Sequence, residues 1–260
     1  MFSRFTVAIA AIGSLLIFTW PFTVSAQMTN DALLAQATFV FLMPLLVTLL
    51  FIELTSGRLD SRELALLGVL AALNAVVRML GAGVAGVETS FFLIIIGAFV
   101  FGPAFGYLLG ASSLLVSALV TGGVGPWLPF QMMAAGLVGI GAGLLPRPKV
   151  AWARTLVLIG YAIIASFGYG ALMTMWNWPY LAGTGTELSY LAGAGPTENL
   201  LRFLRYELFT GGLLWDLGRA VTTSVLLAIS APALLATLGR AANKAGVKRF
   251  SFRGTATKQR

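Results

Sequence analysis

The sequence contains no cysteine and no histidine among its 260 residues. The missing cysteine excludes disulfide bonds and thiolate nucleophiles, and the missing histidine removes the commonest metal ligand and general base. No Walker A sequence is present, so the chain cannot hydrolyse ATP by that route. We therefore expect no catalytic site, no cofactor and no metal site.

Charge is also scarce. Only 10% of the residues are charged and 58% are hydrophobic, with a mean hydropathy of +0.90. Such a chain has more apolar surface than one soluble core can bury, so its solvent is predicted to be lipid. Its apolar runs are too long for barrel strands, which leaves helices. The predicted fold class is all-α, a polytopic integral membrane protein.

Apolar runs between charges, glycines and prolines predict about eight transmembrane helices. They lie near residues 5–25, 31–54, 62–80, 86–102, 104–121, 129–146, 152–178 and 206–239. The charged stretch from Glu53 to Glu63 separates two helices from six. We therefore predict an N-terminal helix pair (1–61), a six-helix membrane core (62–239) and a basic cytoplasmic tail (240–260). The fourth helix is short, and we expect it to be tilted or paired with the fifth through a tight Gly102-Pro103 turn.

The net charge of +8 comes from basic residues that crowd around helix ends and in the tail. This placement favours contact with the lipid bilayer and no nucleic-acid partner. With a cytoplasmic N-terminus, 13 of the 17 basic residues lie inside. The positive-inside rule then predicts cytoplasmic N- and C-termini in a bacterial inner membrane. The first segment, ending in Val24-Ser25-Ala26, also resembles a cleavable signal peptide, but we favour a retained helix.

Small residues recur four apart in two places. In the third predicted helix, Gly68 pairs with Ala72 and Ala71 pairs with Ala75, which creates a flat face either for packing within the chain or for docking a separate membrane subunit. The fifth and sixth helices carry a similar glycine ladder, for which we favour packing within the chain. Its members are Gly102, Gly106, Gly110, Gly139 and Gly143.

Ionisable residues inside or beside the predicted spans include Arg78, Asp216 and Arg219. A charge there costs at least about 2.5 kcal/mol unless it snorkels or is paired. Asp216 and Arg219 can meet on one helix face, with Trp215 on the same side. Two interpretations stay open, an internal salt bridge and the floor of an outward-facing pocket.

A second polar group precedes the last helix. Asn199, Arg202 and Arg205 follow a long irregular segment that contains several aromatic residues. Together with Trp127 and Gln131, these residues have the composition of a small-molecule site. A solvated helix start and an interfacial tryptophan belt are the alternatives.

Four stretches carry a resemblance to a known family. Residues 101–110 (FGPAFGYLLG), 121–131 (TGGVGPWLPFQ), 198–202 (ENLLR) and 215–219 (WDLGR) resemble S components of energy-coupling factor (ECF) transporters. The likeness extends over residues 62–239 and is greatest to the actinobacterial branch assigned to cobalamin.

The resemblance implies a substrate-binding subunit of an ABC importer that takes a vitamin, cobalamin as best guess, from the outside. Its implied partners are a transmembrane scaffold subunit and two cytoplasmic ATPase subunits. It implies substrate-binding roles for Arg78, Trp127, Gln131, Asn199, Arg202, Trp215, Asp216 and Arg219. It further implies a scaffold-docking face formed by Ala65, Gly68, Ala71, Ala72 and Ala75. The alternatives are an ion-coupled carrier, a membrane enzyme acting on lipid-linked substrates, and a structural or assembly protein.

Overall fold

The computed structural model describes residues 4–23, 31–56, 59–81, 86–181, 186–210 and 212–244. Helices and connecting turns account for all of these residues, without a strand among them. The helices are α1 (Arg4–Phe18), α2 (Trp20–Thr23), α3 (Asp31–Thr55), α4 (Ser61–Met79), α5 (Phe91–Phe101), α6 (Pro103–Thr121), α7 (Leu128–Leu144), α8 (Ala151–Leu181), α9 (Pro196–Phe209) and α10 (Gly212–Lys244). The predicted all-α class is confirmed. The possible cleavage site at residues 24–26 and the tail beyond Lys244 lie outside the described residues.

Three helices, α6, α8 and α10, are long and apolar enough to cross a membrane. Shorter apolar helices, which include α5, α7 and parts of α1 and α3, accompany them. Without water in the hydrocarbon layer, a helix satisfies its backbone hydrogen bonds internally. This composition is that of a polytopic membrane protein.

The core is built around α5. All eleven of its residues are buried, and its sequence is almost entirely aromatic and branched aliphatic. At its end Gly102 has φ of 103°, a conformation that strongly favours glycine, and Pro103 begins α6 directly. The predicted tight turn is therefore present, and it lets the short helix α5 fold back on α6.

Helices α6 and α7 cross at their glycines. A Cβ atom added to Gly106 would overlap the backbone of Gly139, and one added to Gly110 would overlap the backbone of Ala135. Backbones approach this closely only where side chains are absent. The prediction that the glycine ladder serves packing within the chain is confirmed.

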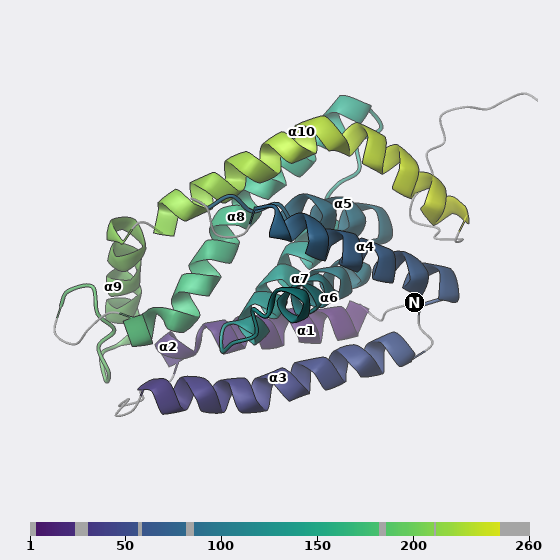
Figure 1. Ribbon diagram of the computed structural model, residues 1–260. Helices are drawn as coiled ribbons and strands as arrows, with labels where there is room; N and C mark the ends of the chain where they lie inside the picture. Colours follow the sequence, from purple (N-terminus) through teal and green to yellow (C-terminus); the bar gives the residue numbers. More distant parts are fainter. Residues whose placement is uncertain are drawn as a thin grey trace, which may run out of the picture.

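The N-terminal helices lie beside this core (Figure 1), with α1 packed mainly on α7 and α3 also against α7. The Phe18 ring, at the end of α1, is fully buried and lies edge-on to Phe130 at 5.7 Å between centroids. The first predicted span is divided, because the chain turns at Thr19 before α2.

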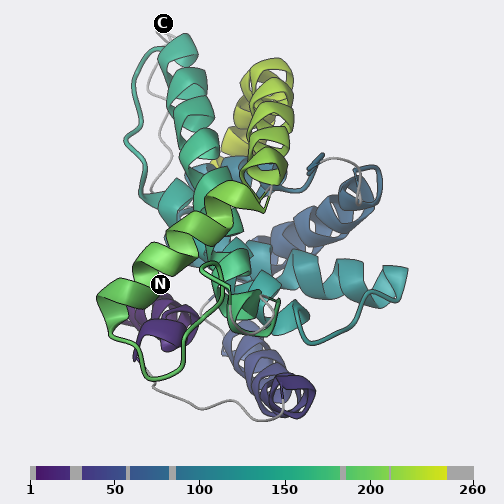
Figure 2. The ribbon, with the colours of Figure 1, turned by 90° about the vertical axis from the view of Figure 1, so that its left-hand side faces the viewer.

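The prediction of one helix over 206–239 is wrong at both ends. The chain forms two helices there, α9, which already begins at Pro196, and α10, which begins at Gly212 and continues through Lys244. Proline suits the first turn of a helix because its φ angle is already close to the helical value. A backbone N–H in that turn would have no acceptor within the helix, so its absence costs no hydrogen bond. Figures 1 and 2 show α9 lying crosswise over one end of the bundle. We call this the α9 end.

Candidate functional site

An ion pair at the start of α10 forms the centre of the candidate site. The Arg219 guanidinium contacts the carboxylate of Asp216, which is only 2% exposed, and Arg219 also donates a hydrogen bond of 3.0 Å to the carbonyl of Ser166 in α8. The guanidinium lies 4.9 Å from the centroid of the Tyr169 ring. The internal ion pair, one of the two interpretations that the sequence left open, is present. Gly170 allows it, since a Cβ there would overlap the Asp216 carboxylate.

Arg78 brings α4 to the same place. Its Nη1 donates a hydrogen bond of 3.1 Å to the Ser117 hydroxyl in α6, and its Nε lies 3.9 Å from the Glu88 carboxylate. The Phe91 ring lies 4.9 Å from the Tyr169 ring and 5.8 Å from the Arg219 guanidinium, and a Cβ added to Gly86 would overlap the backbone of Trp215 in α10. Residues from α4, α8, α10 and the 86–90 segment therefore converge. We call this group the polar cluster; its members are Arg78, Glu88, Tyr169, Asp216 and Arg219.

The polar cluster has unused hydrogen-bonding capacity. Among the described residues, no hydrogen-bond partner reaches Nε of Arg78, Nε of Arg219, Oδ2 of Asp216 or the hydroxyl of Ser166, which adjoins the cluster, although all four atoms are buried. Buried polar atoms in proteins are nearly always hydrogen-bonded. Buried donors and an acceptor without hydrogen bonds suit a polar ligand or ordered water.

A second buried acid, Glu207 of α9, lies next to this cluster and was not predicted. Its side chain approaches Gly212 and Thr174, yet neither carboxylate oxygen meets hydrogen-bond geometry with a described group. Burial raises the pKa of Glu207 above its ordinary value, and the charge of Asp216 raises it further. The signal that could have found it is the spacing of four from Asn199 to Phe203 to Glu207, which places all three on the buried face of α9.

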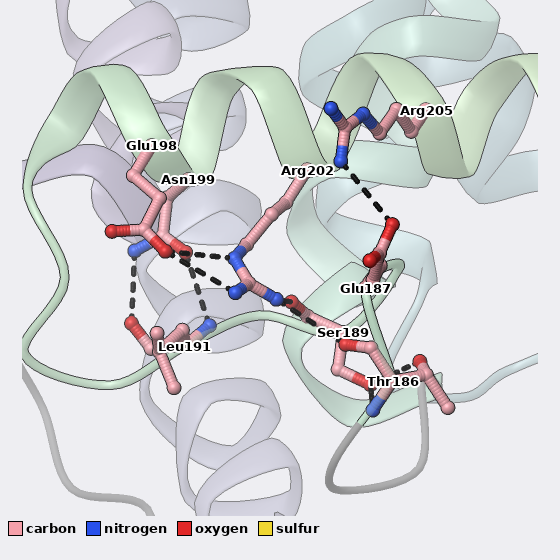
Figure 3. A network of polar contacts seen from close by, with 8 residues as sticks. All are labelled: Thr186, Glu187, Ser189, Leu191, Glu198, Asn199, Arg202 and Arg205. Atoms are coloured by element: carbon pink, nitrogen blue, oxygen red, sulfur yellow. Dashed lines mark hydrogen bonds and ion pairs between the residues drawn. The ribbon is translucent and has the colours of Figure 1, made fainter.

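Asn199 and Arg202 both bind the backbone of a preceding segment of the chain (Figure 3). The Asn199 amide donates to the Leu191 carbonyl and accepts from the Leu191 N–H, both at 3.0 Å. Arg202 donates to the carbonyls of Thr186 at 3.2 Å and Ser189 at 3.5 Å, and it pairs with Glu198 at 3.2 Å. Both side chains are therefore engaged in holding the segment 186–191 against α9.

Aromatic rings hold α9 and the segment 186–191, which together we call the cap, against the bundle. Trp178 of α8 is fully buried, contacts Phe203 and Tyr190 edge-on, and donates a hydrogen bond of 2.8 Å to the Leu188 carbonyl. Phe22 of α2 lies 6.1 Å from Phe203 between ring centroids. The N-terminal helices thus reach the cap at the α9 end.

The remaining predicted site residues lie outside these networks in the described part of the chain. Trp127 and Gln131 are at the start of α7, where Trp127 is 45% exposed. Trp215 adjoins Asp216 but is itself 48% exposed. Of the eight predicted residues, the structure joins Arg78, Asp216 and Arg219 in one cluster and Asn199 with Arg202 in another.

The predicted docking face of α4 is divided. Ala65, Gly68 and Ala72 are exposed, and a Cβ added to Gly68 would meet nothing within 4 Å. Ala71 and Ala75 are only 4% and 3% exposed and pack inside the bundle. The two small-residue pairs therefore lie on different sides of the helix, and Ala71 and Ala75 are not on the open face.

The family model for the substrate-specific component of ECF transporters matches residues 62–227, from α4 into the middle of α10. The chain belongs to this family. No curated protein and no solved structure matches it. Substrate-specific components of ECF transporters are binding subunits in the membrane and not enzymes, and membership of the family implies association with scaffold and ATPase subunits. The match includes the polar cluster and α9, and it leaves α1 to α3 outside.

Proposed function

We propose that this substrate-specific component captures a vitamin at the α9 end and passes it to its partner subunits, with cobalamin as the best candidate. The observation that carries the proposal is the polar cluster, where buried donors and an acceptor lack partners. A ligand that bears amide or hydroxyl groups would complete those hydrogen bonds and so favour binding.

The α9 end is proposed to face the outside of the cell. With cytoplasmic N- and C-termini, most basic residues lie inside, in agreement with the positive-inside rule. Arg78, Asp216 and Arg219 are proposed to contact the ligand directly. Trp127, Gln131 and Trp215 are proposed to supply flanking contacts, while Asn199 and Arg202 act through the segment that they hold.

The docking proposal rests on the open part of α4. Ala65, Gly68 and Ala72 form an exposed stripe of small residues to which a scaffold helix can approach closely. Two ATPase subunits would then supply the energy through the scaffold, since this chain has no Walker A sequence.

The test is a titration of the purified full chain with a panel of vitamins that includes cyanocobalamin. Tryptophan fluorescence, corrected for inner-filter absorption, reports binding. We expect Arg78→Gln and Arg219→Gln to weaken binding about ten- to hundredfold, since a hydrogen bond to a charged group contributes about 1.5–3 kcal/mol. Arg240→Gln is the matched control, because Arg240 is exposed near the other end of α10 and bonds only Thr237 among described groups.

Removing Arg219 alone leaves Asp216 buried without its ion-pair partner, which is itself destabilising. The double variant Asp216→Asn/Arg219→Gln is therefore measured as well, with thermal stability as a check on folding. Unchanged affinity in all folded cluster variants would contradict the site. No binding of any vitamin by the parent chain would contradict the proposed substrate class.

A further inference from the structure

Helix α9 differs from the other long helices in direction and in surface. Figure 1 shows it lying across the end of the bundle, at a large angle to α10, and Figure 2 shows the same crosswise placement from the α9 end. Its 14 residues are too few to cross a bilayer, for which about 20 are needed. Its length and its crosswise direction both set it apart from the spanning helices α6, α8 and α10.

The side chains of α9 fall into three sectors around its axis. Asn199, Phe203 and Glu207 are buried against the bundle. Arg202 and Arg205 form a polar flank that contacts the segment 186–191. The other flank carries leucines.

We call that flank the leucine stripe; it consists of Leu200, Leu204 and Leu208. These residues are 44%, 48% and 62% exposed, and their spacing of four places them in one row. Leu201, which adjoins Leu204 and Leu208 on the helix surface, is 54% exposed. Contiguous exposed apolar side chains of this size mark an interaction surface or a membrane contact.

Exposed apolar residues also occur at the start of α10. Leu214 and Trp215, in the first turn of α10, are 70% and 48% exposed, and Leu217 and Val221 extend the apolar surface along the spanning helix. The outer surface of a membrane-spanning helix contacts lipid, and tryptophan is enriched at the level of the headgroups. Exposed apolar residues therefore follow the leucine stripe along the chain into the spanning helix α10.

We propose that α9 is an interfacial helix whose leucine stripe is inserted into the boundary between lipid headgroups and acyl chains. An amphipathic helix with one apolar flank and one arginine-bearing flank binds a bilayer surface in this orientation. Asn199 and Arg202 hold the segment 186–191 on α9. Contact between α9 and lipid therefore also fixes the position of this segment relative to the bilayer surface. The proposal concerns lipid and is independent of the substrate.

The absence of cysteine allows a direct test with single-cysteine variants of the full chain. Leu204→Cys and Leu208→Cys are labelled with an environment-sensitive fluorophore in phosphatidylethanolamine/phosphatidylglycerol nanodiscs. Arg205→Cys, one residue away on the polar flank, is the matched control, and Val225→Cys in the middle of α10 reports the acyl-chain region. The nanodisc lipids carry nitroxide quenchers on the headgroup, at a shallow position of the acyl chain or at a deep position. Iodide serves as the aqueous quencher.

We expect headgroup and shallow quenchers to act about threefold more strongly at positions 204 and 208 than at 205, as for a helix at the interface. Iodide should show the reverse order, and the deep quencher should act mainly at 225. Equal iodide access at 204, 208 and 205 would overturn the proposal. Shielding of 204 and 208 from both lipid and iodide, found only when the scaffold subunit is present, would also overturn it in favour of a protein interface.

Discussion

Small residues spaced four apart occur in two regions of this molecule and serve differently in each. At the α6–α7 crossing, Gly106 and Gly139 lie backbone to backbone with no room for a Cβ. On α4, Gly68 and Ala72 face outward, and a Cβ at Gly68 would meet no atom. The spacing creates a flat helix face in both regions, but whether that face is already occupied depends on where the helix lies.

The largest expected effect is at the crossing. Gly139→Val would drive a branched side chain into the backbone of Gly106, which cannot move as a flexible side chain can. We expect a loss of about 3 kcal/mol or more in the free energy of unfolding, at the upper end of overpacking effects. Thermal unfolding of the detergent-solubilised protein measures it. A melting temperature equal to that of the parent would contradict the close crossing.

The buried pair on α4 comes next. Ala71→Leu adds three carbons at a position that is 4% exposed, so we expect a cost of about 1–3 kcal/mol in the stability of the isolated chain. The same thermal unfolding experiment applies. An unaltered stability together with weakened scaffold binding would instead place Ala71 on the docking face.

The open pair should show the opposite pattern. In the isolated chain, a leucine side chain at position 68 would point into empty space, so Gly68→Leu should not lower the stability of the protein. The same side chain would keep a scaffold helix from approaching closely. We expect about tenfold weaker scaffold association, equivalent to about 1.4 kcal/mol. Copurification at graded scaffold concentrations measures this. Wild-type association with Gly68→Leu would remove α4 as the docking helix.

The smallest effect is expected at a glycine that has no neighbour. Gly160 in α8 is exposed and a Cβ there would meet nothing within 4 Å. Gly160→Ala should raise stability by about 0.5–1 kcal/mol, because alanine loses less backbone entropy in a helix. A decrease in melting temperature would show that the backbone at residue 160 contacts something.

Several features of the site could be predicted from residue type and spacing. The Asp216–Arg219 pair follows from a separation of three on a helix, and the arginine at 78 stands out as a charge in an apolar surrounding. Glu207 was missed because it was assigned to the start of a single long helix, where an acid needs no explanation. The separate helix α9 places it on a buried face instead.

Asn199 and Arg202 show a different limit. Their residue types indicate polar recognition, but the groups that they contact, the backbone of 186–191, lie 8 to 16 residues away in the chain. Side-chain type identifies a donor or acceptor and does not identify its partner. The same amide and guanidinium could bind a ligand or a loop, and in this fold they bind the backbone of the segment 186–191.

The sequence alone determined the solvent and the class of structure, because so apolar a chain must reside in lipid, where helices satisfy their own backbone. It also determined the tight turn at Gly102 and the local ion pair, since both depend on neighbours within a few residues. Tertiary structure alone decided which small-residue face is filled, which acid lies against the polar cluster and how α9 is oriented. These depend on contacts between distant segments, which composition and spacing leave open.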